Sequence, residues 1–138
     1  MTQNSCVLAL ITAQSSCARI LKTAKEYAER FGCALDVLTV QPLKADAKQR
    51  SKDMLCLTAL AKEQKVNIRI VYSDKPVHAI AAEVQQSAPV HVFIGQSGER
   101  ATVNEHLFAP FGLPVSVVGV NGVIYTLPAF VPAQNLTH

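Results

Sequence analysis

The chain has 138 residues, of which 49% are hydrophobic and 17% are charged, and its formal net charge is +3. This length is typical of one domain with a substantial core, and the composition excludes extensive disorder. The weak positive charge and the 6% aromatic content argue against nucleic-acid binding. No apolar run reaches the length of a membrane span, the start lacks a signal-peptide pattern, and the cysteines form no CxxC pair. We therefore expect a cytoplasmic protein that makes no membrane contact.

Short apolar runs alternate with runs of helical periodicity along the chain. Five runs have the length and apolar content of strands: 6–11, 34–40, 66–72, 90–94 and 115–120. Helical periodicity is found over 17–31, in a segment after Ala45 that becomes apolar at Met54, and in a segment from Pro76 that Pro89 stops. We expect Gly32 to end the first helix in a left-handed conformation.

Two further expectations concern the third strand and the third helix. Residues 66–72 alternate apolar with polar side chains, which is typical of a half-exposed strand near a sheet edge. Ser73 or Asp74 is expected to cap the third helix, with Pro76 in its first turn. The apolar residues of this helix that should face the core are Val77, Ile80, Ala81 and Val84.

This order of elements predicts an α/β fold. Strands joined by helices of this length form an open five-stranded parallel sheet of Rossmann-like type, with helices on both faces. The segment 101–109 has room only for a shortened fourth helix. After the Asn121-Gly122 turn, residues 123–127 (VIYTL) form a C-terminal β extension, either antiparallel to the fifth strand or across to a second subunit. We expect one domain over 1–127 and an irregular tail over 128–138.

The turns after the first and fourth strands are the candidate ligand site. In an open parallel sheet, ligands bind at the carboxyl ends of the strands, where the winding direction reverses. Glycines let the backbone approach a phosphate, and amide and hydroxyl groups donate to it. The candidate residues are Thr12, Ala13, Ser15, Ser16, Gly95, Gln96, Ser97, Gly98 and Arg100. The alternative is that Gly95 only ends a strand and Gly98 only begins a helix.

Two segments resemble a known family. Residues 73–98 (SDKPVHAIAAEVQQSAPVHVFIGQSG) resemble the second half of universal stress protein domains, with an acidic-proline turn, a helix, an apolar strand and a G-x-x-G turn. Residues 14–38 (QSSCARILKTAKEYAERFGCALDVL) are similar to the stress-protein-like domain of potassium-sensing histidine kinases. The resemblance covers about 5–120. It implies an adenine nucleotide alpha hydrolase-like fold, a homodimer, a signalling protein as partner, and ATP or another adenine nucleotide as ligand. We expect the dimer contact to use the fifth strand and residues 123–127, because an uncovered apolar edge strand would otherwise promote aggregation.

The sequence departs from the nucleotide-binding branch of that family. Gly95 and Gly98 match, but Phe108 and Ala109 stand where those proteins have Gly followed by Ser or Thr, and Thr12 replaces an Asp. The resemblance therefore implies a ligand-binding or regulatory module with weak affinity for an adenine nucleotide. The alternatives are a ligand-free interaction and dimerisation domain with a decayed pocket, and a weak nucleotide hydrolase. Some sensor-kinase relatives bind a cyclic dinucleotide through serines in the first loop and a pair of aromatic residues on the second strand. This interpretation is the weakest, because residues 35–39 of the second strand include no aromatic residue.

None of the remaining motifs indicates an enzyme. His78, His91 and His106 have no metal-ligand spacing, and neither a Walker loop nor a G-x-S-x-G elbow occurs. His91, between two valines, is interpreted as a strand residue whose hydrogen bonds are satisfied. No catalytic or metal site is predicted.

Overall fold

The computed structural model describes residues 5–11, 17–43, 46–95, 108, 110–119 and 124–127. Its strands are β1 (Cys6–Leu10), β2 (Ala34–Gln41), β3 (Ile68–Tyr72), β4 (His91–Gly95), β5 (Val115–Val118) and β6 (Ile124–Leu127). The α-helices in these residues are α1 (Cys17–Phe31), α2 (Ala47–Gln64) and α3 (Pro76–Ser87). Apart from the short helix expected over 101–109, the predicted elements therefore form, with bounds that differ by a few residues.

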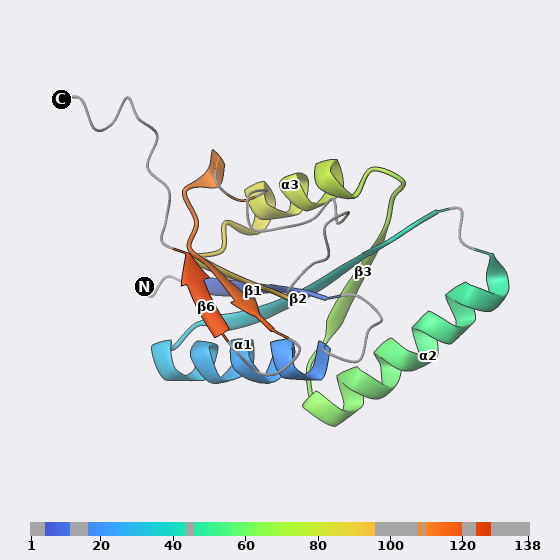
Figure 1. The fold of residues 1–138 in the computed structure, drawn as a ribbon, viewed down its shortest axis with the longest axis horizontal. Helices are drawn as coiled ribbons and strands as arrows, with labels where there is room; N and C mark the ends of the chain where they lie inside the picture. Colours follow the sequence, from blue (N-terminus) through green and yellow to red (C-terminus); the bar gives the residue numbers. More distant parts are fainter. Residues whose placement is uncertain are drawn as a thin grey trace.

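The strands make one sheet in the order β3-β2-β1-β4-β5-β6 (Figure 1). The first five run parallel, as predicted, and β6 pairs antiparallel with β5, from Val115 opposite Leu127 to Val118 opposite Ile124. The C-terminal extension thus returns within the same chain. This pairing resolves the alternative that the sequence left open.

Helices cover both faces of the sheet, as the strand order requires (Figure 1). One core cluster joins α1 and Leu57 of α2 to side chains such as Val7, Ala9 and Val37. The other joins Ile80 and Val84 of α3 to side chains of the opposite face. A strand that contributes to both clusters, such as β1, lies between two layers of helices. For this reason apolar and polar residues do not alternate along it.

The predicted end of the first helix is confirmed, because Gly32 has φ +68. The predicted cap of α3 is wrong. Lys75 occupies the N-cap position without a side-chain cap bond, while the backbone N–H of Lys75 donates to Ser73 Oγ. Asp74 is not free to cap because its Oδ1 accepts the N–H of Leu43. A contact between loops distant in sequence has replaced the local one.

The predicted core face of α3 is also narrower than expected. Ile80 and Val84 are buried, but Val77, one turn earlier on the same face, is 37% exposed. Ala81 is only partly buried. The expected short helix over 101–109 lies outside the described residues apart from Phe108, which is in a 3₁₀ turn. Among the residues described, no helix combines the length and apolar character that crossing a membrane demands.

Candidate functional site

The carboxyl ends of β1 and β4 lie side by side near the centre of the sheet. Val7 pairs with His91 and Ala9 with Phe93, so the two strands end next to each other. The chain moves outward from β1 through β2 to β3, and on the other side of β1 from β4 to β5. The winding direction therefore reverses between β1 and β4, which is the position at which open α/β sheets bind ligands.

The predicted site loops leave from these two ends. Gly95 is the last residue of β4 and is partly buried. The other predicted residues lie outside the described part of the chain: Thr12, Ala13, Ser15, Ser16, Gln96, Ser97, Gly98 and Arg100. The structure consequently brings together the strand ends from which the candidate residues extend, and their contacts with a ligand remain a prediction.

Gly95 has a packing role that the sequence did not reveal. A Cβ atom on this residue would lie 2.9 Å from Cδ1 of Ile20, which comes from the buried face of α1. This contact is shorter than van der Waals distance, so the absence of a side chain lets α1 approach the end of β4. The interpretation that Gly95 ends a strand for structural reasons has this direct support.

A polar pair at the end of β2 was also missed. Thr39 is fully buried, and its Oγ1 accepts a hydrogen bond of 2.8 Å from Nε2 of Gln41. The N–H of Ile11 donates to the carbonyl of Leu38 at 3.0 Å, so β2 stays paired with the chain as it leaves β1. The threonine within the apolar run Val37–Val40 was the available signal. This pair lies at the carboxyl end of β2, and the candidate site lies at the carboxyl ends of β1 and β4 in the same sheet.

Phe108 accounts for one of the departures noted in the sequence. Its side chain is 0% exposed and packs in the cluster with Ile80, Val84 and Ile94. The position that the sequence predicts to correspond to a glycine of nucleotide-binding universal stress proteins is therefore part of the hydrophobic core in this chain. The phenyl side chain carries no hydrogen-bond donor for a phosphate.

His91 lies at the amino end of β4, away from the candidate site. Its Nε2 is 2.8 Å from Ser116 Oγ, which is 2.8 Å from Thr126 Oγ1, so a chain of polar groups crosses β4, β5 and β6. The imidazole stacks on Phe93 with ring centroids 4.7 Å apart and contacts Tyr27 at the same distance. Burial lowers the pKa of His91 below its usual value. The predicted satisfied strand histidine is confirmed.

The described residues bring together no group of three or more His, Cys, Asp or Glu side chains that could hold a metal ion. The charged cluster that does form is structural. Arg69 of β3 binds Asp36 of β2 through two hydrogen bonds, of 3.0 and 2.8 Å, and also pairs with Glu83 of α3. The hydrogen bonds to Asp36 are the main reason why the pKa of Arg69 is raised.

Comparison with known proteins places this architecture. No protein-family model matches the sequence, and no curated protein matches it. Solved structures do match. A universal stress protein from Archaeoglobus fulgidus has a TM-score of 0.64 at 16% identity, covering 85% of this chain and 94% of that one. A universal stress protein in complex with cAMP has a TM-score of 0.63 at 14% identity, with 86% and 99% covered. A universal stress protein family member from Burkholderia pseudomallei has a TM-score of 0.61 at 16% identity, with 83% and 95% covered.

The fold is thus an open α/β sheet of the adenine nucleotide alpha hydrolase-like type, as the sequence predicted. More narrowly, the chain has the universal stress protein fold over most of its length, which confirms the predicted resemblance at the level of fold. The similarity of residues 14–38 to potassium-sensing kinases stays a prediction.

Proposed function

We propose that this chain is a universal stress protein-like regulatory module that binds an adenine nucleotide weakly at the carboxyl ends of β1 and β4. The observation that carries the proposal is the shared fold with a universal stress protein crystallised with cAMP, over 86% of this chain. The adjacent ends of β1 and β4 form the switch point of the sheet, where open α/β folds bind such ligands, and this position supports the proposal. ATP and other adenine nucleotides are the proposed ligands, and the cytoplasm is the proposed location.

The proposed contacts come from the two loops that follow these strands. Backbone N–H groups of Gln96, Ser97 and Gly98 would donate to a phosphate, and Arg100 would add a positive charge. Thr12, Ala13, Ser15 and Ser16 would line the opposite side. The affinity is expected to be low because Phe108, a core residue, replaces a second set of phosphate donors.

A thermal-shift titration with ATP, AMP and cAMP, with GTP as a control, tests this proposal. Ligand at about 100 times its dissociation constant adds about 2.7 kcal/mol to the free energy of unfolding, which raises Tm by several degrees. Gly98→Val should abolish the shift by placing a side chain against the phosphate. Arg100→Gln should weaken binding, whereas Arg30→Gln makes the same charge change in the last turn of α1 and should not. The absence of a shift with every adenine nucleotide would refute the proposal.

The burial of Phe108 favours a second candidate, a ligand-free interaction and dimerisation domain. Because β6 covers β5 within the chain, a second copy or a signalling protein would meet the edge of β6 rather than β5. Native mass spectrometry separates the two candidates. A nucleotide that co-purifies supports the first, and a dimer without ligand supports the second.

A further inference from the structure

The second surface of interest lies between α2 and β3, away from the candidate nucleotide site. Of the residues of α2, all of which the structure describes, Leu57 is the one that is buried. The helix stands out from the sheet beyond α1 and β3 (Figure 1). Two hollows, of about 730 and 390 Å³, lie between α2 and β3. Met54 and Thr58 line both hollows, which are therefore adjacent along α2.

We call this hollow surface the α2–β3 groove. Its floor includes Ile68, Ile70 and Tyr72, which are alternate residues of β3 and so share one face of the strand. Its other wall follows α2 at helical spacing, from Ala47 to Ala61. The part of α2 that lines the groove, from Ala47 to Lys62, is about 23 Å long, so the groove has the length of a peptide rather than that of a small ligand.

Large apolar side chains remain exposed along this groove. Leu55 is 74% exposed and Leu43 55%, and Tyr72 is also accessible. Arg50 holds the wall in place, because its guanidinium lies 4.7 Å from the Tyr72 ring centroid and donates to the carbonyl of Leu43. The Tyr72 hydroxyl reaches Met54 Sδ at 3.6 Å. A preformed apolar surface of this kind is typical of interaction sites.

The charges around the groove select the sign of the partner. Between residues 46 and 65 the basic residues are Lys48, Arg50, Lys52, Lys62 and Lys65, and the acidic ones are Asp46, Asp53 and Glu63. This segment therefore carries two of the three net positive charges of the chain. Its Asp46 and Asp53 side chains are hydrogen-bonded to Gln49. The lysines lie toward the two ends of the helix, with apolar residues between them. This pattern favours an acidic partner and opposes a second, equally basic copy.

The strand beside the groove has a free edge. β3 is the end strand of the sheet and pairs with β2 alone among the strands that the structure describes. An end strand presents unpaired N–H and C=O groups that an extended peptide can use. We propose that the α2–β3 groove binds an extended segment of a partner protein that adds a strand to β3. Alternate apolar side chains of that segment enter the groove, and acidic residues at its two ends meet the lysines of α2.

A labelled synthetic peptide tests the proposal by fluorescence anisotropy. The probe alternates valine with threonine and has glutamates at both ends. Compared with a peptide that ends in lysines, it should bind about ten-fold more tightly, and added salt should reduce this preference. N-methylation of alternate backbone nitrogens on the side that faces β3 should abolish binding, because those groups can no longer donate. Amide exchange over 68–72 should slow when the probe binds.

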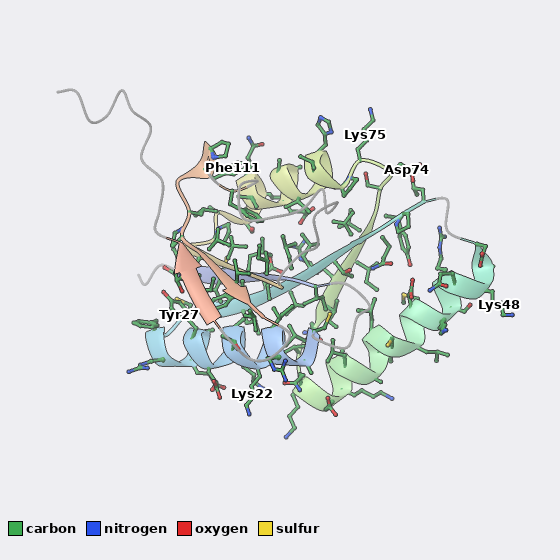
Figure 2. The ribbon with its side chains drawn as sticks, viewed as in Figure 1. Lys22, Tyr27, Lys48, Asp74, Lys75 and Phe111 are labelled. Atoms are coloured by element: carbon green, nitrogen blue, oxygen red, sulfur yellow. The ribbon has the colours of Figure 1, made fainter. Side chains whose placement is uncertain are left out.

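Matched variants locate the site. Lys62→Glu on α2, at a lysine that lines the groove, should weaken binding about ten-fold, whereas Lys22→Glu, the same exposed change on α1, should not. Lys22 lies on α1 and Lys48 marks the outer end of α2 (Figure 2). Leu55→Asp should abolish binding without unfolding the protein, since Leu55 is exposed.

Three results would overturn the proposal. One is equal binding of the N-methylated peptide, and another is tighter binding of a helix-forming peptide of the same composition. The third is a dimer of the peptide-free protein that Leu55→Asp dissociates in sedimentation velocity, which would identify a second copy as the occupant. Peptide anisotropy and amide exchange over 68–72 are measured without nucleotide, and the thermal shift is measured without peptide. The failure of one proposal can therefore be distinguished from the failure of the other.

Discussion

At the scale of single residues, Gly95 shows how packing and ligand binding place the same demand on one position. Both a close helix and a close phosphate exclude a side chain there. The contact with Ile20 is observed, whereas the phosphate is proposed. A substitution at this position therefore measures the packing role first, and any ligand effect must be measured against that background.

Gly95→Ala should lower the free energy of unfolding by up to about 1 kcal/mol, because its Cβ would lie 2.9 Å from Cδ1 of Ile20, the end of a buried side chain that must then shift. Ile20→Val removes that terminal carbon and alone should cost about 1 kcal/mol. In the double variant the two losses should not add, because the clash is gone. Urea unfolding of the four proteins in this cycle provides the measurement. Additive losses would show that Gly95 and Ile20 do not interact.

His91 gives a residue-scale prediction about pH. Burial lowers its pKa in the folded protein below the ordinary value of 6.5, so the unfolded chain takes up the proton first as pH falls. The stabilisation is complete above about pH 7 and is lost as pH decreases through the folded-state pKa. His91→Gln keeps an amide able to reach Ser116 Oγ but does not titrate. The free energy of unfolding, measured in urea between about pH 7 and pH 5, should fall more in the native protein than in this variant. If the free energy of unfolding changed with pH by the same amount in both proteins, His91 would not be the source of the pH dependence.

At the scale of elements, a charged cluster ties α3 to the β2–β3 edge. Arg69 binds Asp36 and Glu83, but its side chain is 45% exposed, so solvent reduces the strength of each pair. Glu83→Gln should therefore cost no more than about 0.5 kcal/mol. Arg69→Met should cost more, about 1–2 kcal/mol, because it leaves the mostly buried carboxylates of Asp36 and Glu83 without the partner that they share. Urea unfolding at low and high salt tests the difference, and equal losses for the two variants would refute this account.

The helices differ in how much of each could be predicted from sequence. The stripe of α1 was clear because Ile20, Leu21 and Ala24 fill one face and all are buried. In α2 the sequence becomes apolar from Met54, but Leu57 is the one residue of this helix that is buried, and Leu60 is only partly buried. Sequence periodicity identifies an apolar face, but it does not reveal which part of that face another element covers.

The candidate site was predictable to a smaller extent. Strand order follows from the alternation of elements, so the switch point between β1 and β4 could be placed in advance. The contact of Gly95 with Ile20 and the recruitment of Asp74 by Leu43 join residues far apart in sequence. Such contacts depend on how helices, strands and loops pack against each other in the folded chain. A local sequence pattern does not predict them.

At the scale of the whole molecule, β6 determines what the C-terminal side of the sheet presents. β5 is buried along its full length, from Val115 to Val118, and β6 covers its outer edge. Thr126 of β6 also hydrogen-bonds Ser116 of β5. Without β6, an apolar strand would become the edge of the sheet, which is an arrangement that promotes association between chains.

Two shortened chains test the proposed domain, which extends to residue 127. A chain that ends at Leu127 keeps β6 and should unfold in urea with a free energy within about 0.5 kcal/mol of the full chain. A chain that ends at Gly119 loses the β5–β6 ladder and the Thr126 hydrogen bond. It should be less stable and should self-associate as its concentration rises, which sedimentation velocity detects. If the shorter chain is monomeric and equally stable, β6 is not part of the domain. If the longer one is strongly destabilised, the domain extends into 128–138, because residues beyond β6 must then contribute to the fold.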